Sequence, residues 1–401
     1  MSRLERDLIK AFFIALASFA VVVLILHFTL ARSLSNNKGF GTWVNLYKDL
    51  SYSAISDNIG EDTVMMMGSS EFQHGRNSKY HPTKLFRKMG VDVMCIGAAY
   101  NQSLSHAITL GSVSEKMKGH KVVLLLSPAW FDNQGVKKDA FSVRFSETQF
   151  IALMQNPKLS KDLKRKIANR TIQLLENDKG TRANVEMYAN YYIDGKLGPV
   201  NKAYIKMREG FLNERERINI NSMWRLKGQK EYEQFMKNVD GKAPNWEEYK
   251  EQADAQYFKK ATNNPYGIIN GTYNKKFAHI DKSGKNKMKE RQFRKDSPEY
   301  KDLELFLEVC KESDIDVMLV LLPINGKWYD HLGFSKEARS VLPGQIKEVA
   351  DKYDVKWYSF YNEDYTAGFL QDVFHPAGKG WTEINERAYK FFTEKSSSNQ
   401  K

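Results

Sequence analysis

Five short apolar runs constrain the fold of this chain more than any other feature of its sequence. They span residues 63–67, 91–96, 121–126, 316–322 and 355–360. Each run is nearly continuous rather than alternating, which is typical of strands buried on both faces of a sheet. Helical patterns lie between the runs, and alternating strands and helices predict a parallel sheet between two helical layers. The predicted fold class is therefore α/β, a three-layer sandwich.

Several helices can be placed from their apolar stripes and end signals. One follows Gln102 and carries Leu104 and Ile108 on one face. Another begins after Ser297, a good N-cap, with Pro298 at its first position. Residues 336–353 and 378–392 complete the set of helices expected between and after the strands.

The pattern changes between residues 130 and 296, where strand-like runs disappear and lysines and aromatic residues become dense. One helix is expected there with Ser160 as its cap and Gly180 as its stop. We interpret 130–296 as a mostly helical, basic insertion between the third and fourth strands. Residues 396–401 are expected to form a disordered polar tail.

The N-terminal segment 11–30 contains no Asp, Glu, Lys or Arg. About 20 such residues suffice for a helix to cross the hydrocarbon core of a bilayer. The apolar stretch is longer than that of a secretory signal, and no good cleavage site follows it, so an uncleaved anchor is favoured over a signal peptide. The flanking charges place the N-terminus in the cytoplasm. Residues 1–33 are thus predicted to be the anchor of a single-pass membrane protein, and 34–395 an extracytoplasmic domain.

The formal net charge is +13. Such an excess suggests nucleic acid, an anionic membrane surface or a polyphosphate polymer as surroundings, although lysines that only maintain solubility would give the same number. Basic residues cluster within 282–294 and at five positions near 160. These are Lys158, Lys161, Lys164, Arg165 and Lys166. A solvated helix face is the default interpretation of such clusters, and a surface for an anionic polymer is the alternative.

Two cysteines, Cys95 and Cys310, do not make a disulfide framework, and both lie in apolar patterns as small buried residues would. No metal-ligand spacing and no phosphate-binding loop of the Gly-x-x-x-x-Gly-Lys type occurs. The sequence therefore predicts no metal and no cofactor.

Polar residues that could carry chemistry follow the predicted strands. Ser70 follows the first strand, in the run Gly68-Ser69-Ser70-Glu71. The others are Gly97, Asn101 and Gln102 after the second strand, Trp130 after the third, and Asp372 and His375 after the fifth. Because ligands bind at the carboxyl ends of parallel strands, these residues are expected to meet in one cleft. A serine after Gly-x is by itself more often an ordinary turn residue; its combination with Asp-x-x-His favours catalysis.

Among the eight histidines, His375 is the best candidate for a base. Asp372, three residues earlier, can accept from Nδ1 and leave Nε2 facing a serine. His331 beside Asp330 is the rival. His74, His81 and His106 are interpreted as polar surface residues, and His120 lies at the wrong end of its strand.

This combination of motifs resembles the SGNH (GDSL-like) hydrolase superfamily, whose fold is flavodoxin-like. The resemblance implies Ser70 as nucleophile, Asp372 as orienting acid and His375 as base. It also implies oxyanion donors at the N–H groups of Ser70 and Gly97. Two departures stand out: Ser69 occupies a position where aspartate is common, and no Gly-x-Asn-Asp follows the third strand. Asn101, Gln102 or a group near Trp130 would have to supply the third donor.

More narrowly, the chain is similar over nearly its whole length to the membrane-anchored D-alanine transfer proteins that act on teichoic acids in Gram-positive bacteria. The features carrying this are the N-terminal anchor, Gly68-Ser69-Ser70-Glu71-Phe72, Gly97 with the run Asn101-Gln102-Ser103-Leu104, Ser127-Pro128-Ala129-Trp130-Phe131 and Asp372-Val373-Phe374-His375-Pro376. The resemblance implies acyl transfer of D-alanine onto (lipo)teichoic acid outside the membrane. Implied partners are the polymer, a membrane-bound O-acyltransferase and small accessory or D-alanyl carrier proteins, with no nucleic acid. A carrier-protein thioesterase and a non-catalytic scaffold for the acyltransferase are the alternatives.

Overall fold

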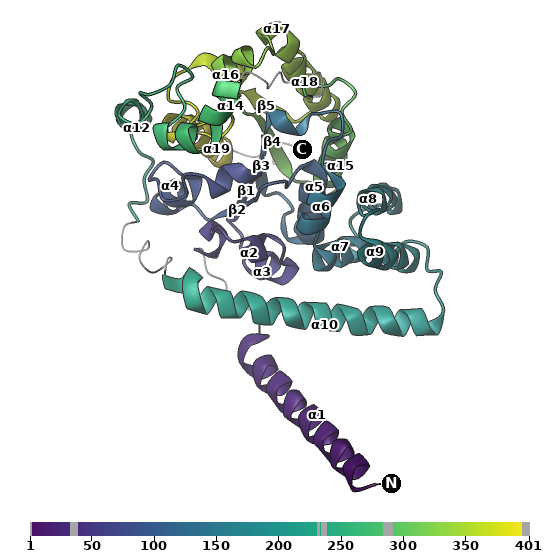
Figure 1. Cartoon of the computed structure of the whole chain (residues 1–401). Helices are drawn as coiled ribbons and strands as arrows, with labels where there is room; N and C mark the ends of the chain where they lie inside the picture. The colour runs from purple at the N-terminus through teal and green to yellow at the C-terminus, as the bar shows by residue number, and fades with distance from the viewer. Residues whose placement is uncertain (1, 33–38, 231–232, 234–238, 284–291, 395–401) are drawn as a thin grey trace.

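A five-stranded, all-parallel sheet forms the centre of the protein in the computed structural model (Figure 1). The structure describes residues 2–32, 39–230, 233, 239–283 and 292–394. The strands are β1 (Val64–Gly68), β2 (Val93–Gly97), β3 (Lys121–Leu126), β4 (Asp316–Leu321) and β5 (Lys356–Ser359). Their order, β2-β1-β3-β4-β5, is that of the flavodoxin-like doubly wound sheet. The prediction of an α/β fold with a parallel sheet is confirmed.

Both faces of the sheet are covered, and successive side chains of a strand enter different cores. Met65 and Met67 belong to one apolar cluster, whereas Met66 between them belongs to the other. Strands β1 to β4 are buried almost throughout, as their continuous apolar runs predict. The prediction of a buried fifth strand is wrong, because β5 is an edge strand with one neighbour and is half-exposed.

Helices form a layer on each face of the sheet (Figure 1). The first layer consists of α5 (Ser103–Val113), α15 (Glu299–Glu312) and α18 (Val341–Tyr353). The second consists of α4 (Pro82–Lys88), α12 (Trp246–Phe258) and α19 (Gly378–Thr393). Residues 336–353, expected as one helix, divide at Ser340 into α17 (Lys336–Arg339) and α18.

The described residues between β3 and β4 form no strand. Their longer helices are α6 (Lys138–Arg144), α7 (Glu147–Gln155), α8 (Lys161–Leu174), α9 (Lys179–Tyr192), α10 (Pro199–Met223) and α12. Helices α7 to α9 pack beside α5 and α15, while α12 packs against α19. Ser160 caps α8 as expected, but α8 ends at Leu174, and Gly180 lies inside α9. Lys164, expected on a solvated face, is buried.

Shorter helical segments connect these elements. They are η1 (Phe40–Thr42), α2 (Leu46–Asp49), α3 (Tyr52–Asp57), η2 (Ser70–Gln73), η3 (Ser114–Lys116), η4 (Pro128–Trp130), η5 (Trp224–Gly228), α13 (Asn270–Thr272), η6 (Tyr273–Phe277), α14 (Ala278–Ser283), α16 (Gly326–His331) and η7 (Tyr361–Tyr365). Most of the second basic cluster, residues 284–291, lies outside the described residues, as does the tail 396–401. The domain limits drawn from the sequence remain predictions.

Helix α1 (Arg3–Leu30) projects from the domain below α10 (Figure 1). Within the described part of the chain it is the helix whose length and apolar composition suit a membrane span. Its end is attached to α10, since the Asn221 side chain donates to the Arg32 carbonyl at 2.7 Å. The chain thus has a candidate N-terminal membrane anchor.

Candidate active site

Ser70 lies at the carboxyl edge of the sheet, where β1 turns into the short helix η2. The turn is crowded: a Cβ on Gly68 would lie 2.9 Å from the Phe72 ring. As the first residue of η2, Ser70 has a backbone N–H that lacks an acceptor within that helix. Its hydroxyl is only partly buried, so it is both positioned and accessible.

The structure brings Ser70, His375 and Asp372 together. Ser70 Oγ lies 2.8 Å from His375 Nε2, although 305 positions separate the two residues. His375 Nδ1 lies 2.8 Å from Asp372 Oδ2. Because an ionised carboxylate can only accept, Nδ1 carries the imidazole proton and Nε2 accepts from the serine hydroxyl. This is the geometry of a nucleophile, a base and an orienting carboxylate.

Asp372 is held in its ionised form by its neighbours. Burial raises its pKa, but hydrogen bonding to His375, the positive charge that His375 can carry and the N–H groups of Phe374 and His375 outweigh burial, so the net effect lowers the pKa. Asp372 Oδ1 accepts from the N–H of Phe374 at 3.1 Å and from that of His375 at 2.9 Å. The carboxylate therefore organises its own loop as well as the imidazole.

The loop carrying Asp372 and His375 is fixed to the segment that follows β4. Asn325, which follows β4, donates its N–H to the Val373 carbonyl at 2.9 Å. Within the loop, Gln371 N–H donates to the His375 carbonyl at 2.9 Å. Leu370 and Pro376 form an antiparallel bridge. These bonds hold the loop, whose residues lie beyond the last strand, at the carboxyl end of β4.

His74 is a site residue that sequence reasoning placed on the surface. Its ring stacks on that of His375, with centroids 3.6 Å apart and an interplanar angle of 20°. Its Nδ1–H donates to the Ser70 carbonyl at 2.9 Å. Burial, and then the charge of His375, lowers the pKa of His74, which favours a neutral ring. The one signal in the sequence was its position four residues after Ser70.

Glu71 lies buried behind the serine. Its Oε2 accepts from the Ser69 N–H at 2.6 Å, and burial raises its pKa. The Ser69 hydroxyl donates to the Ala98 carbonyl at 3.1 Å. Ser69 and Glu71 therefore fix the backbone on both sides of Ser70, and the Ser69 hydroxyl is committed to the backbone.

His81 and His106 are also buried, contrary to the prediction of polar surface residues. His106 Nε2–H donates to the Gly68 carbonyl at 2.9 Å, and burial lowers its pKa to about 4. His81 Nε2–H donates to the Phe72 carbonyl at 3.1 Å, and burial lowers its pKa to about 3. Each is a neutral donor that satisfies a backbone carbonyl two residues from Ser70, which apolar patterning alone does not reveal.

Gly97 does not offer the N–H that the resemblance implied. That N–H donates to Asp49 Oδ2 at 3.2 Å. Gly97 ends the edge strand β2, where alternate residues direct their backbone groups outward, and Lys48 beside Asp49 likewise donates to the Cys95 carbonyl. The glycine is required by packing, because a Cβ there would lie 2.4 Å from the Phe72 ring.

Asn101, Gln102 and Trp130 lie at the same edge of the sheet but are buried. Among the described residues, no hydrogen bond links their side chains to Ser70, His375 or Asp372. The Asn101 Oδ1 and Gln102 Oε1 atoms lack partners in the described structure. Trp130 is a core residue whose ring lies 6.3 Å from that of His106. Trp130 is therefore linked to the Ser70 turn only through His106, which donates to the Gly68 carbonyl.

The rival base lies in another cluster: His331 Nε2 is 3.0 Å from Asp281.

His74, Asp372 and His375 have ligand atoms within 4.8 Å of one another, close enough to share a metal ion. Both nitrogens of His375 are already engaged by Ser70 and Asp372. The arrangement therefore fits proton transfer better than metal binding.

Comparison with known proteins connects this site to a family. Residues 38–393 match the family described as "DltD protein". The chain is 29% identical over 341 residues to "Protein DltD" of Staphylococcus aureus (strain NCTC 8325 / PS 47), which covers 84% of this chain and 83% of that protein. It is 27% identical over 351 residues to the Bacillus subtilis (strain 168) protein of the same name, covering 84% and 85%. For that of Lacticaseibacillus rhamnosus the identity is 24% over 346 residues, covering 84% and 79%.

Proposed function

The chain belongs to the DltD family, and from that premise we propose that it transfers D-alanine to teichoic acid on the outer face of the membrane. The observation that carries the proposal is the continuous hydrogen-bonded series from Ser70 Oγ through His375 to Asp372. The resemblance noted from the sequence supplies the substrate class. The flavodoxin-like strand order and the serine after β1 further support an SGNH-type fold.

In the first step, Ser70 Oγ attacks the carbonyl carbon of an activated D-alanyl group while His375 Nε2 takes the hydroxyl proton. The new bond is an ester between Oγ and the carbonyl carbon. The bond to the leaving group breaks, and His375 returns the proton to that group. Asp372 stabilises the imidazolium that forms between these events.

In the second step, a hydroxyl of the glycerol or ribitol units attacks the acyl-serine ester, with His375 again as base. The ester of the polymer forms, and the Ser70 hydroxyl is regenerated. The Ser70 N–H is the first donor to the oxyanion. The N–H groups of Gly97, Ala99 and Asn101 already donate to Asp49, Gln73 and Ala98, so we assign the further donor to the side chain of Asn101. One missing donor costs about 10²–10³ in rate.

The same proposal places α1 in the membrane with its N-terminus in the cytoplasm. The domain is then extracellular, where teichoic acid lies. A membrane-bound O-acyltransferase and a small D-alanyl carrier or accessory protein are the partners. The positive charge of the chain favours the phosphate backbone of the polymer.

Replacement of Ser70 by alanine tests the proposal. In cells whose only copy is S70A, D-alanyl esters on teichoic acid are expected to disappear, and a serine-directed fluorophosphonate is expected no longer to label the protein. S69A is the matched control, because its hydroxyl serves the Ala98 carbonyl rather than His375. It should retain labelling and most esters.

Normal ester content in S70A at normal protein levels would remove Ser70 from the mechanism. Absence of labelling in the parent chain together with its partners would favour the scaffold. Protease protection of the domain on intact cells would place it in the cytoplasm and favour the carrier thioesterase.

A further inference from the structure

Helix α10 exposes an apolar stripe that the fold of the domain does not explain. Val200, Met207 and Phe211 are 79%, 68% and 61% exposed. Intervals of seven and four residues place them on one helix face. The opposite face is buried through Ile205, Leu212 and Ile220. Single exposed apolar residues are common, but three aligned large ones mark a contact surface.

The same face of α10 receives the end of α1. His27 Nδ1 lies 3.0 Å from the Glu214 carboxylate, and the Arg225 guanidinium donates to the Thr29 carbonyl at 3.1 Å. Glu214 lies three positions after Phe211 and so shares its face by helical geometry. Arg225 lies just beyond the end of α10, in η5. The stripe therefore faces the side of the domain from which α1 leaves.

The contact between α1 and α10 determines where α10 lies relative to the bilayer. In Figure 1, α10 runs crosswise to α1, between the end of α1 and the rest of the domain. If α1 spans the bilayer, its last turn lies where hydrocarbon gives way to headgroups. Helix α10 is tied to that turn and lies across it. The apolar stripe of α10 then lies at the boundary between hydrocarbon and headgroups. Amphipathic helices that lie on a membrane bury their apolar faces at this boundary.

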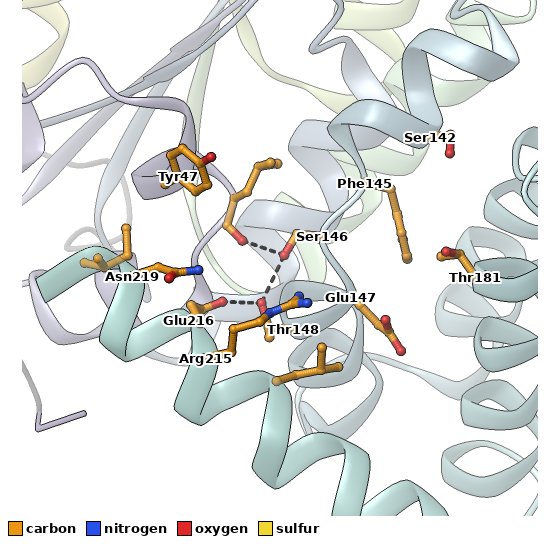
Figure 2. A pocket seen from close by; sticks show the side chains of 13 residues that line it. Tyr47, Ser142, Phe145, Ser146, Glu147, Thr148, Thr181, Arg215, Glu216 and Asn219 are labelled. Carbon is orange, nitrogen blue, oxygen red and sulfur yellow. Dashed lines mark hydrogen bonds between the residues drawn. The ribbon is translucent and has the colours of Figure 1, made fainter. Parts of the chain in front are cut away.

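Exposed cations surround the junction of the two helices. Arg32, Arg215 and Arg225 are all exposed. Arg215 lies over the Phe211 ring at 5.9 Å, and no carboxylate pairs with it among the described residues. It also lines an open pocket of about 440 Å³ beside α10 (Figure 2).

The two carboxylates in that pocket are already bound. Glu147 accepts from Arg208 at 2.6 Å, and Glu216 accepts from the Ser53 N–H at 2.8 Å. Figure 2 shows Glu216 joined to Thr148 as well. The guanidinium of Arg215 is thus free to bind a phosphate at headgroup level.

We propose that α10 is a second membrane-contacting element, whose stripe of Val200, Met207 and Phe211 inserts at the interface of an anionic bilayer while Arg215 contacts lipid phosphates. The inference rests on the proposed insertion of α1, and it goes beyond the proposed function. Contact at both α1 and α10 fixes the tilt of the domain, which an anchor on a flexible connection would leave free.

The test uses the purified full-length chain in bilayers of phosphatidylcholine and phosphatidylglycerol. Nitroxide labels are attached at M207C and F211C, and their accessibility to oxygen and to an aqueous nickel complex is compared. Both native cysteines are buried, which limits background labelling. K347C on α18 is the exposed control on the domain, and L16C in α1 is the hydrocarbon control. The α10 labels are expected to favour oxygen, as L16C does, while K347C favours nickel.

Water-like readings at M207C and F211C beside a lipid-like L16C would overturn the inference and leave the anchor intact. A stripe reserved for a partner protein would give that result, because the sample contains none. Water-like readings at L16C as well would overturn the anchor too. Replacing phosphatidylglycerol by phosphatidylcholine is expected to move F211C toward water, and less so when R215Q is added. No shift with lipid charge would overturn the role of Arg215.

Discussion

The ring of His74 lies against the ring of His375, with centroids 3.6 Å apart, while its Nδ1–H donates to the Ser70 carbonyl at 2.9 Å. One side chain thus contacts both residues of the Ser70–His375 pair. The stack limits rotation of the His375 ring, and the hydrogen bond limits movement of the Ser70 backbone. His74 is therefore a positioning residue of the site.

Replacement of His74 should lower the rate at which Ser70 reacts with a fluorophosphonate, without unfolding the domain. H74A loses the stack and the hydrogen bond, which is expected to reduce the rate of fluorophosphonate labelling about 3- to 10-fold, the value of one net hydrogen bond. H74F keeps a stacked ring and should recover part of the rate. Labelling rates and thermal unfolding are measured together. Equal rates in H74A, H74F and the parent chain would contradict the assignment.

Replacement of Asp372 should reduce labelling of Ser70 far more than replacement of Asp281, the carboxylate that pairs with His331. D372N keeps the shape but offers an amide to His375 Nδ1 and favours the wrong tautomer, so labelling is expected to fall by about 10³–10⁴. D281N, which alters the partner of His331, is the matched control and should label normally. A large effect of D281N with none of D372N would transfer the role of base to His331.

Gly97 should be required for packing. In G97A the new Cβ would lie 2.4 Å from the Phe72 ring and 2.8 Å from the Gly68 carbonyl oxygen. A loss of about 1–3 kcal/mol in the free energy of unfolding is expected. G344A in α18 meets nothing within 4 Å and should be neutral or stabilise by up to about 1 kcal/mol. The free energies of unfolding of G97A and G344A are measured by chemical denaturation in detergent. Similar values for the two variants would refute the packing argument.

Acid should destabilise the domain through its buried histidines. Burial lowers the pKa of His106 from its ordinary value of 6.5 to about 4, so the unfolded chain binds the proton more tightly. The contribution of neutral His106 to the free energy of unfolding is complete above about pH 6.5. At pH 5 this contribution is smaller by about 2 kcal/mol. H106Q, whose amide can still donate to the Gly68 carbonyl, should show a weaker pH dependence than the parent. H279Q, at an exposed position, should behave as the parent does; equal slopes in H106Q and the parent would contradict this assignment.

Much of the framework was predictable because burial has a local signature. The runs 63–67 and 121–126 are nearly all apolar since both faces of β1 and β3 are covered, and Cys95 and Cys310 were correctly expected to be buried. The run at 355–360 misled for the same reason: its aromatic residues resemble those of a buried strand, but β5 has one neighbour. Polar burial was missed at His81 and His106, because a histidine gives no sign of the carbonyl that it will meet.

Local patterns were sufficient to predict the strands and most of the helices, the apolar N-terminal helix and the residue types gathered at Ser70, Asp372 and His375, because hydrophobic periodicity and short motifs are local. Three pairings became known only from the folded molecule: Asp49 accepts from the Gly97 N–H, His74 stacks on His375, and α1 ends against α10. Those pairings depend on which groups meet after distant segments pack, and no local pattern carries that information.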